Sequence, residues 1–225
     1  MTSNEDSRLV AVLAGASGLV GSHLLRLLLQ SPGYRQVIAL VRRPLEPQDQ
    51  RLLQVEVNFE SLPPLSEFAG ADVYCALGTT MKQAGSREAF RKVDYDAELA
   101  FAAVAAKGGA RQFLLVSSIG ANAASSTFYL QVKGQLEDAV KALPFQAVHI
   151  FRPSFLAGDR ASNRPVERIG TAVARALDFA LSGKLKKYSP VEASGLAAAM
   201  VHAASRRESG VHIHEYEQIL ALAAG

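Results

Sequence analysis

From residue 9 onward, short unbroken apolar runs alternate with longer stretches in which apolar residues recur at helical spacing. The run 9–14 is apolar at nearly every position, which is the pattern of a strand buried on both faces of a sheet. The stretch 19–30 carries leucines at helical spacing and is followed by the helix-stopping residues Ser31, Pro32 and Gly33. The same alternation predicts strands at 36–41, 52–57, 71–76, 112–117 and 146–151 and helices at 86–107 and 127–143. This order is typical of an α/β protein with a doubly wound parallel sheet.

After residue 152 the pattern is weaker. It indicates helices at 161–180, 194–204 and 215–224, a basic loop at 183–189 and a short strand at 211–214. We expect residues 155–225 to form a small lid on the substrate side of the strand ends, within one domain that spans 9–225. The polar segment 1–8 is expected to be a disordered tail.

Composition and charge describe an ordinary soluble protein. The chain is 49% hydrophobic and 20% charged, and its net charge of +3 is too small to indicate a nucleic-acid surface. The longest early apolar stretch is interrupted by Arg26, so we expect no membrane segment. Cys75 has no partner for a disulfide and lies in an apolar run, where a core position is favoured over a redox role. A single cysteine and no signal peptide lead us to expect a cytoplasmic protein.

A glycine-rich turn follows the first predicted strand. Residues 15–21 read Gly-Ala-Ser-Gly-Leu-Val-Gly and lead directly into the first predicted helix. Glycines at this place allow the backbone to approach a pyrophosphate, and the helix N-terminus supplies N–H donors and a positive dipole end. The turn therefore predicts a dinucleotide site, although a merely tight turn has the same glycines.

The end of the second predicted strand indicates which nucleotide is bound. Sites for NAD place an acidic residue there, whereas this chain has Arg42 and Arg43 and no acid before Glu46. A guanidinium group binds a 2′-phosphate through paired hydrogen bonds, and a carboxylate would repel it. The pair favours NADP, with two solvated surface arginines as the alternative.

A tyrosine and a lysine four positions apart form the candidate catalytic pair. Tyr129 and Lys133 share one face of the predicted helix 127–143, where the ammonium charge favours the phenolate form of tyrosine. Tyr129 can then donate a proton to a carbonyl that receives hydride, while Lys133 binds the nicotinamide ribose. Ser118, at the end of the strand 112–117, is the candidate to bind the substrate oxygen, and Ser117 is the weaker alternative.

Taken together and in this order, these motifs resemble the atypical short-chain dehydrogenases/reductases. The chain is more closely similar to the HIV Tat-interacting protein (oxidoreductase) family, whose bacterial members bind NAD(P)H. The resemblance implies a Rossmann fold and covers most of the chain. It is carried by residues 15–21, 41–44, 76–80, 90–96, 116–120, 129–137 and 151–154.

The resemblance also implies a role for individual residues. It implies that the pyrophosphate contacts Gly15, Ser17, Gly18, Leu19 and Val20, and that the 2′-phosphate contacts Arg42 and Arg43. It implies that adenine contacts Asn58 and Phe59, and that the ribose contacts Leu77, Gly78 and Thr79. It implies that the nicotinamide contacts Arg152, Pro153 and Phe155. It implies that Ser118, Tyr129 and Lys133 are catalytic, and that Tyr129 and Lys133 also contact the cofactor.

Three positions depart from the family pattern. Asp94 stands where many short-chain dehydrogenases have a catalytic asparagine, which puts the usual proton relay in doubt. Asn58 replaces a common aspartate near adenine and retains hydrogen-bonding capacity. Ser118 and Tyr129 are only eleven positions apart, so the loop between them must have its own geometry.

The leading hypothesis is an NADPH-dependent reductase of a small carbonyl compound. The alternative is an NADPH-binding regulatory protein with a protein partner and little or no turnover, because members of the family act as regulators. A sugar-nucleotide epimerase is disfavoured, since that fold usually has a larger substrate domain. We expect no metal site: His212 and His214 share a strand face without a third ligand, and His149 is expected in the core.

Overall fold

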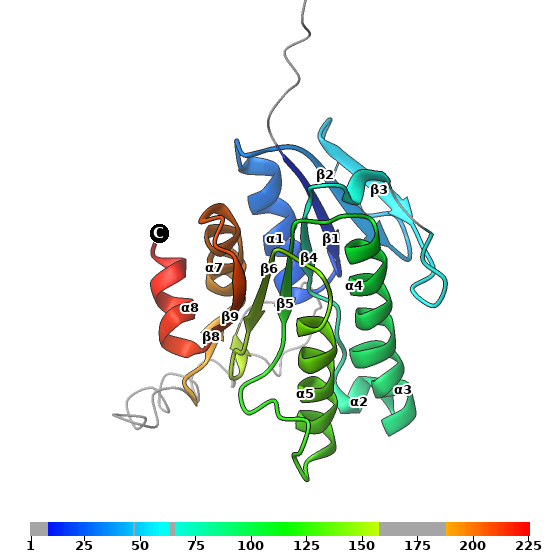
Figure 1. The fold of residues 1–225 in the computed structure, drawn as a ribbon, viewed down its shortest axis with the longest axis vertical. Helices are drawn as coiled ribbons and strands as arrows, with labels where there is room; N and C mark the ends of the chain where they lie inside the picture. Colours follow the sequence, from blue (N-terminus) through cyan, green and yellow to red (C-terminus); the bar gives the residue numbers. More distant parts are fainter. Residues whose placement is uncertain (1–8, 47, 64–65, 158–187) are drawn as a thin grey trace, which may run out of the picture.

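A seven-stranded parallel sheet forms the centre of the protein (Figure 1). The computed structural model describes residues 9–46, 48–63, 66–157 and 188–225. In spatial order the strands are β3 (Leu52–Glu56), β2 (Tyr34–Val41), β1 (Leu9–Ala14), β4 (Asp72–Cys75), β5 (Gln112–Val116), β6 (Ala147–Phe151) and β9 (Gly210–His214). The predicted doubly wound parallel sheet is confirmed. A separate parallel pair, β7 (Leu156–Ala157) and β8 (Val191–Glu192), follows β6 in the chain.

Helices cover both faces of the sheet. They are α1 (Leu19–Gln30), α2 (Met81–Ala84), α3 (Arg87–Arg91), α4 (Glu98–Lys107), α5 (Phe128–Lys141), α7 (Ala193–Ser205) and α8 (Tyr216–Ala223), together with a 3-10 turn, η1 (Ser66–Phe68). The helix predicted at 86–107 is interrupted by a π-helical stretch, η2 (Lys92–Ala97), between α3 and α4. None of the helices in the described part of the chain combines the length and the hydrophobicity needed to cross a bilayer.

Alternate residues of each strand point into two separate cores. In β1, Leu13 packs with α1, α7 and α8, whereas Val12 packs with α4 and α5. Both side chains are fully buried, as is Cys75 in the second core. Because each strand needs apolar side chains on both faces, the runs read from the sequence are unbroken rather than alternating.

The expected lid over residues 155–225 needs correction. Residues 193–225 do not lie over the strand ends: β9 pairs in parallel with β6, α7 packs against α1, and α8 packs against α7 in the first core (Figure 1). This segment completes the Rossmann-type sheet: β9 extends it beyond β6, and the apolar faces of α7 and α8 are buried, with α7 in contact with β5 and α8 in contact with β9. The expected tail 1–8 and helix 161–180, and most of the basic loop 183–189, lie outside the described residues.

The rings of three histidines stack across the neighbouring strands β6 and β9. The ring of His149 lies 4.8 Å from that of His212 and 5.4 Å from that of His214, and His149 Nδ1 is 3.1 Å from His214 Nε2. Phe151 extends the stack at 4.6 Å from His214. His149 is completely buried, as the sequence predicted, and its Nε2 has no hydrogen-bond partner in the described part of the chain. The rings lie parallel to one another, so they form a packed stack.

We expect acid to destabilise the fold through this stack. Burial, with the neighbouring imidazoles, lowers the pKa of His149 to about 3 and that of His214 to about 4. The unfolded chain takes up these protons near pH 6.5, whereas the folded protein does not. Their contribution to stability is therefore complete above about pH 6.5 and is lost as the pH falls toward about 4. Each pH unit in that range costs about 1.4 kcal/mol per histidine.

Urea unfolding of the wild type and of His149→Phe at about pH 7 and about pH 5 measures this effect. The wild type should lose about 2 kcal/mol more of its unfolding free energy than the variant between the two conditions. His23→Gln, at a partly exposed position on α1, is the matched control and should lose as much as the wild type. Equal losses in all three proteins would exclude the stack as the acid-sensitive element.

Candidate functional site

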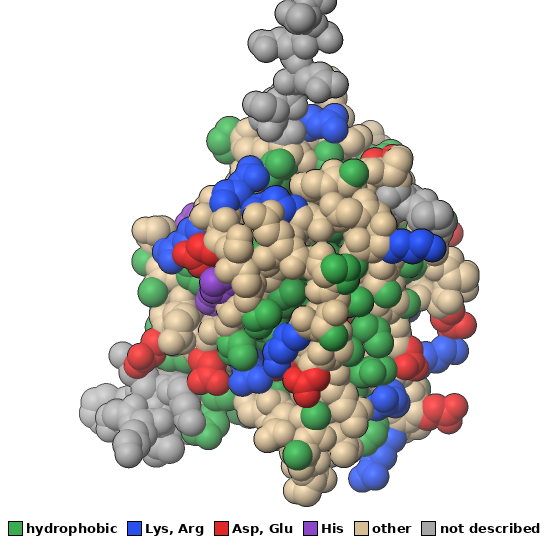
Figure 2. Space-filling model, viewed as in Figure 1, with side chains coloured by type: hydrophobic (Ala, Val, Ile, Leu, Met, Phe, Trp, Pro, Cys, Tyr) green, Lys and Arg blue, Asp and Glu red, His purple; other side chains and the backbone are tan. Residues whose placement is uncertain are grey.

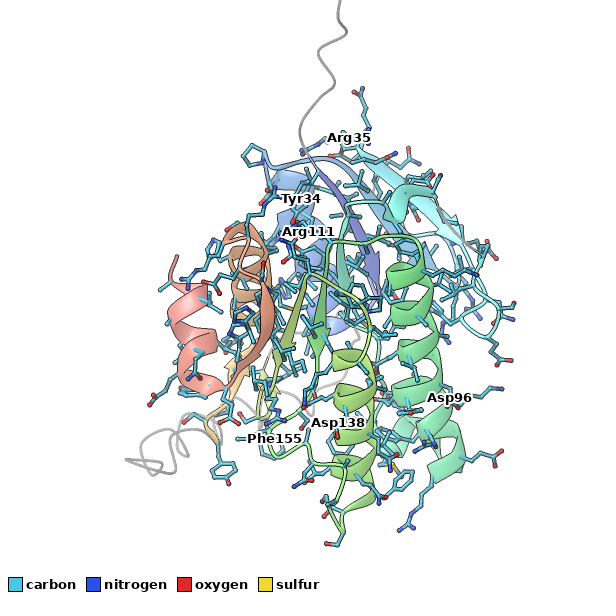
Figure 3. All side chains as sticks on the ribbon, in the orientation of Figure 1. Tyr34, Arg35, Asp96, Arg111, Asp138 and Phe155 are labelled. Atoms are coloured by element: carbon cyan, nitrogen blue, oxygen red, sulfur yellow. The ribbon has the colours of Figure 1, made fainter. Side chains whose placement is uncertain are left out.

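Every strand of the main sheet ends at the same edge. All six pairings are parallel, so the loops that follow β1, β2, β3, β4, β5 and β6 leave the sheet side by side. The chain order reverses between β1 and β4, and ligands of doubly wound sheets bind at such a switch point. Phe155, which follows β6, lies at this edge, whereas Tyr34 and Arg111 lie at the opposite end (Figure 3).

The turn after β1 is packed so closely that only glycine fits. Gly15 has φ of 90°, and a Cβ atom there would overlap the carbonyl oxygen of Ala76 at the end of β4. A Cβ atom on Gly21 would overlap the carbonyl oxygen of Gly15. The two glycines therefore hold α1 against the turn and bring the turn against β4 at the switch point.

The start of α1 fits an anion. In the described structure no side chain caps this end, and its first turn contains no acidic residue. Its free main-chain N–H groups and the positive end of the helix dipole suit a pyrophosphate. Ser17 is exposed and Gly18 and Leu19 are half-buried, but the Val20 side chain is in the core, so Val20 can offer only its backbone.

The loops after β2 and β3 differ in what they can offer a nucleotide. Arg42 and Arg43 are exposed, and neither guanidinium group has a partner among the described residues. Asn58 is exposed, and its side-chain oxygen accepts a hydrogen bond from the Glu60 N–H at 2.9 Å. The Phe59 side chain is buried against Phe101 instead, with ring centroids 6.5 Å apart, so an adenine contact from Phe59 would have to use its backbone.

The loop after β4 is held by a buried carboxylate. Asp94 Oδ2 accepts a hydrogen bond from the Thr79 N–H at 2.8 Å. Gly78 has φ of 147°, and a Cβ atom there would stand 3.4 Å from Asp94 Oδ1. Leu77 and Thr79 are half-buried and Gly78 is exposed, so this loop passes the switch point with its backbone accessible.

Asp94 also binds the candidate catalytic lysine. Lys133 Nζ lies 2.8 Å from Asp94 Oδ1 and 2.9 Å from Glu98 Oε1, and all three side chains are buried. Cys75 Sγ donates to Glu98 Oε2 at 3.7 Å. Asp94 lies in the π-helical stretch η2, and Glu98 follows it as the first residue of α4; π-helical stretches often mark functional sites. The sequence pointed to Asp94 but missed Glu98, whose only signal was its place one helical turn after Asp94.

One ammonium group between two carboxylates leaves an excess of negative charge in a buried place. Burial raises the pKa of Glu98 to about 8, with Asp94 acting in the same direction and Lys133 opposing it. Burial disfavours the charged form of Lys133, but Glu98 and Asp94 outweigh it and raise the lysine pKa. Burial also raises the pKa of the Cys75 thiol. Lys133 is therefore charged and Glu98 holds a proton near neutral pH.

Tyr129 is half-buried one helical turn before Lys133. Its ring lies 5.4 Å from that of the buried Phe90, and its hydroxyl has no hydrogen-bond partner among the described residues. Ser118 is also half-buried, and its hydroxyl makes a long hydrogen bond of 3.4 Å to the Ile119 carbonyl. In the described structure no hydrogen bond joins Ser118 to Tyr129. Both hydroxyl groups are therefore available to a third molecule.

The short loop between Ser118 and Tyr129 is fixed by Gly134. A Cβ atom on Gly134 would overlap the backbone of Asn122 and Ala123, so the loop folds directly onto α5. The Asn122 N–H also donates to the Leu130 carbonyl at 3.1 Å. This packing explains how two residues eleven positions apart both reach the carboxyl edge of the sheet.

The residues after β6 are placed differently from one another. The Arg152 guanidinium binds Glu137, through Nε at 3.0 Å and Nη2 at 2.6 Å, and the Ser117 hydroxyl donates to the same carboxylate at 2.6 Å. The Arg152 side chain is thus committed to α5. Pro153 is buried, and Phe155 is 79% exposed at the strand ends. Ser117 is excluded as the free hydroxyl of the pair, which leaves Ser118.

A protein-family model and two similar proteins identify the same family for this chain. A protein-family model described as NAD(P)H-binding matches residues 15–177. Protein HTATIP2 of Rattus norvegicus is 40% identical over 160 residues, which cover 69% of this chain and 66% of that protein. The mitochondrial protein FMP52-1 of Scheffersomyces stipitis is 38% identical over 158 residues, which cover 68% of this chain and 70% of that protein.

A solved structure shows the same fold at low identity. DesIV, a dTDP-glucose 4,6-dehydratase from Streptomyces venezuelae with NAD and TYD bound, superimposes with a TM-score of 0.68 at 16% identity. The match covers 96% of this chain and 80% of that one. The likeness identifies a Rossmann-type fold.

The expectation of a cytoplasmic protein is overturned by these relatives. Several FMP52 proteins similar to this chain are named mitochondrial. The expectation depended on a single cysteine and the lack of a recognisable signal peptide. An unpaired thiol is typical of reducing compartments in general and does not single out the cytosol.

Proposed function

Because this chain belongs to the NAD(P)H-binding family, we propose that it is an NADPH-dependent oxidoreductase of the atypical short-chain dehydrogenase type. Its substrate is a small carbonyl compound. Tyr129 is the acid of the reaction.

The proposed dinucleotide lies along the carboxyl edge of the sheet. The free N–H groups at the start of α1 bind its pyrophosphate, and Arg42 and Arg43 bind the 2′-phosphate. Other contacts come from Asn58 at adenine, from the loop 77–79 at the ribose, and from Pro153 and Phe155 beside the nicotinamide. The exposure of both arginines and the uncapped first turn of α1 support this arrangement.

The cofactor supplies hydride when it is bound. Tyr129 donates its phenolic proton to the carbonyl oxygen, and Ser118 donates a hydrogen bond to the same oxygen. Lys133 remains charged, so that it stabilises the phenolate that Tyr129 becomes. Its third N–H, beyond those bound by Asp94 and Glu98, is available to the nicotinamide ribose and to the Tyr129 oxygen.

One observation carries the proposal: Asp94 binds both Lys133 Nζ and the Thr79 N–H. A single buried carboxylate thereby fixes the catalytic lysine relative to the loop that passes the ribose. If Lys133 served only to pack α5, its counter-ion would not also have to bind the loop that follows β4. The shared carboxylate supports a site in which cofactor and proton donor are held together.

NADPH oxidation across a panel of small aldehydes and ketones tests the function. We expect turnover with at least one class, followed by the loss of NADPH absorbance. Tight NADPH binding without oxidation of any carbonyl would instead support the regulatory alternative, in which the partner is another protein. Conversion of a nucleotide sugar without net NADPH oxidation would support an epimerase.

A further inference from the structure

Glu98 has no part in the chemistry described so far, yet it is one of the most deeply placed charged residues of the site. Its side chain is completely buried at the start of α4. Oε1 accepts from Lys133 Nζ at 2.9 Å, and among the described residues Oε2 accepts only from the thiol of Cys75, at 3.7 Å. A thiol is a weak donor, so this second oxygen is poorly satisfied as a carboxylate.

Asp94 is the better counter-ion of the two carboxylates. It accepts from Lys133 Nζ at 2.8 Å and from the Thr79 N–H at 2.8 Å, so both of its oxygens face strong donors. Asp94 alone neutralises Lys133. A second ionised carboxylate would leave one uncompensated negative charge in a buried cluster, which is costly. The titratable groups that face Glu98 in the described structure are Lys133 on α5, Asp94 on η2 and Cys75 on β4. Lys133 and the hydrogen bond from Cys75 favour its ionised form, whereas burial and Asp94 outweigh them and favour the protonated form.

We propose that Glu98 is the internal proton store of the active site and resupplies, through Lys133, the proton that Tyr129 gives to the substrate. This inference rests on the proposed reductase function. Glu98 acts through Lys133 without touching the substrate, so it is a positioning and relay residue.

The proton transfers balance in one turnover. The Tyr129 O–H bond breaks and an O–H bond forms on the carbonyl oxygen, whose carbon has received the hydride. An N–H proton of Lys133 then moves to the Tyr129 oxygen, and the Glu98 carboxylic proton moves to Lys133 Nζ. Glu98 ends as a carboxylate, and a proton from solvent returns along the same path after the alcohol leaves. No oxidant or reductant beyond the cofactor is needed.

The steady-state rate of NADPH oxidation at saturating substrate, measured as a function of pH, tests the relay, because every turnover after the first requires Tyr129 to have regained its proton. The wild-type rate should fall above about pH 8, where Glu98 has lost its proton. The rate of Glu98→Gln should equal, at every pH, the low rate that the wild type reaches at high pH, which is about tenfold below the wild-type rate near neutrality. Its pH–rate profile should therefore show no fall near pH 8. Asp94→Asn removes the charge that helps Glu98 keep its proton, so the rate of this variant should begin to fall at a lower pH than that of the wild type.

Glu137→Gln is the matched control. Glu137 is an equally buried carboxylate on α5, but it binds Arg152 rather than Lys133. Whatever its rate, this variant should keep the fall near pH 8. A purely structural role of Glu98 would lower the rate of Glu98→Gln uniformly and leave the shape of its pH profile unchanged.

A measurement without turnover separates this inference from the function on which it rests. Infrared difference spectra between about pH 6 and about pH 10 should show a carboxylic acid C=O band that is lost at high pH and is absent from Glu98→Gln. An active wild type whose fall in rate near pH 8 persists in Glu98→Gln would overturn the relay and leave the reductase standing. An inactive wild type would overturn the reductase, and a missing infrared band would overturn the proton store in either case.

Discussion

Tyr129→Phe is expected to lower NADPH turnover by a factor of about 10² to 10⁴, the usual contribution of a positioned general acid. The substitution removes one oxygen atom from a half-buried ring that packs against Phe90 at 5.4 Å. The ring contact and the Lys133 cluster remain, so cofactor affinity and the melting temperature should stay close to the wild-type values. Steady-state kinetics and NADPH titration calorimetry on the same preparations measure both quantities.

Tyr216→Phe is the control for the loss of a tyrosine hydroxyl. Tyr216 begins α8, and its side chain is buried in the core that also contains α1 and α7, with no part in the proposed site. Its substitution should leave turnover at the wild-type level. If Tyr129→Phe retains turnover, Tyr129 is not the acid, and another hydroxyl at the carboxyl edge, such as that of Ser118, must take that role.

The double substitution Arg42→Ala with Arg43→Ala is expected to weaken NADPH binding about 100-fold and NADH binding little. Hydrogen bonds to charged groups contribute about 1.5 to 3 kcal/mol each, and the two arginines face a doubly charged 2′-phosphate that NADH lacks. Neither side chain supports the fold through a partner in the described structure, so the melting temperature should change little. Calorimetric titration with each coenzyme gives the ratio of dissociation constants.

Arg35→Ala provides the matched control on the same strand. Arg35 is exposed near the amino end of β2 (Figure 3). Arg42 and Arg43 instead follow the carboxyl end of this strand. The removal of Arg35 changes the net charge of the protein without touching the proposed site, and both affinities should stay unchanged. Equal losses for NADPH and NADH in the double variant would refute the 2′-phosphate assignment. Positive and negative side chains are interspersed on the face shown in Figure 2, so a general field effect is small.

Local patterns were sufficient for most of the architecture. The helix 19–30 and the strand 9–14 were predicted to the residue, because side-chain periodicity reports directly which faces are buried. The glycine turn could also be predicted from the sequence. Gly15 and Gly21 must lack a Cβ atom, because other backbone atoms approach both positions closely. The positions of Tyr129 and Lys133 on one helix face followed from their spacing of four.

Other features depend on partners that are distant in the chain. Glu98 is an ordinary helical residue until folding brings Lys133, 35 positions later, against it. Arg152 and Phe59 were expected at the cofactor, but their side chains bind Glu137 and pack on Phe101 instead. The charge and direction of a polar side chain are set by burial and by its neighbours in space, which no local pattern contains.

The sequence by itself determined the alternation of strands and helices, the dinucleotide turn and the family to which the chain belongs. The tertiary structure alone decided that residues 193–225 complete the sheet and that Lys133 sits between two carboxylates. The physical reason is the same in both cases. Whether β9 joins β6, 63 positions earlier in the chain, and whether Glu98 keeps its proton, depend on which surfaces exclude water together after the whole chain has packed.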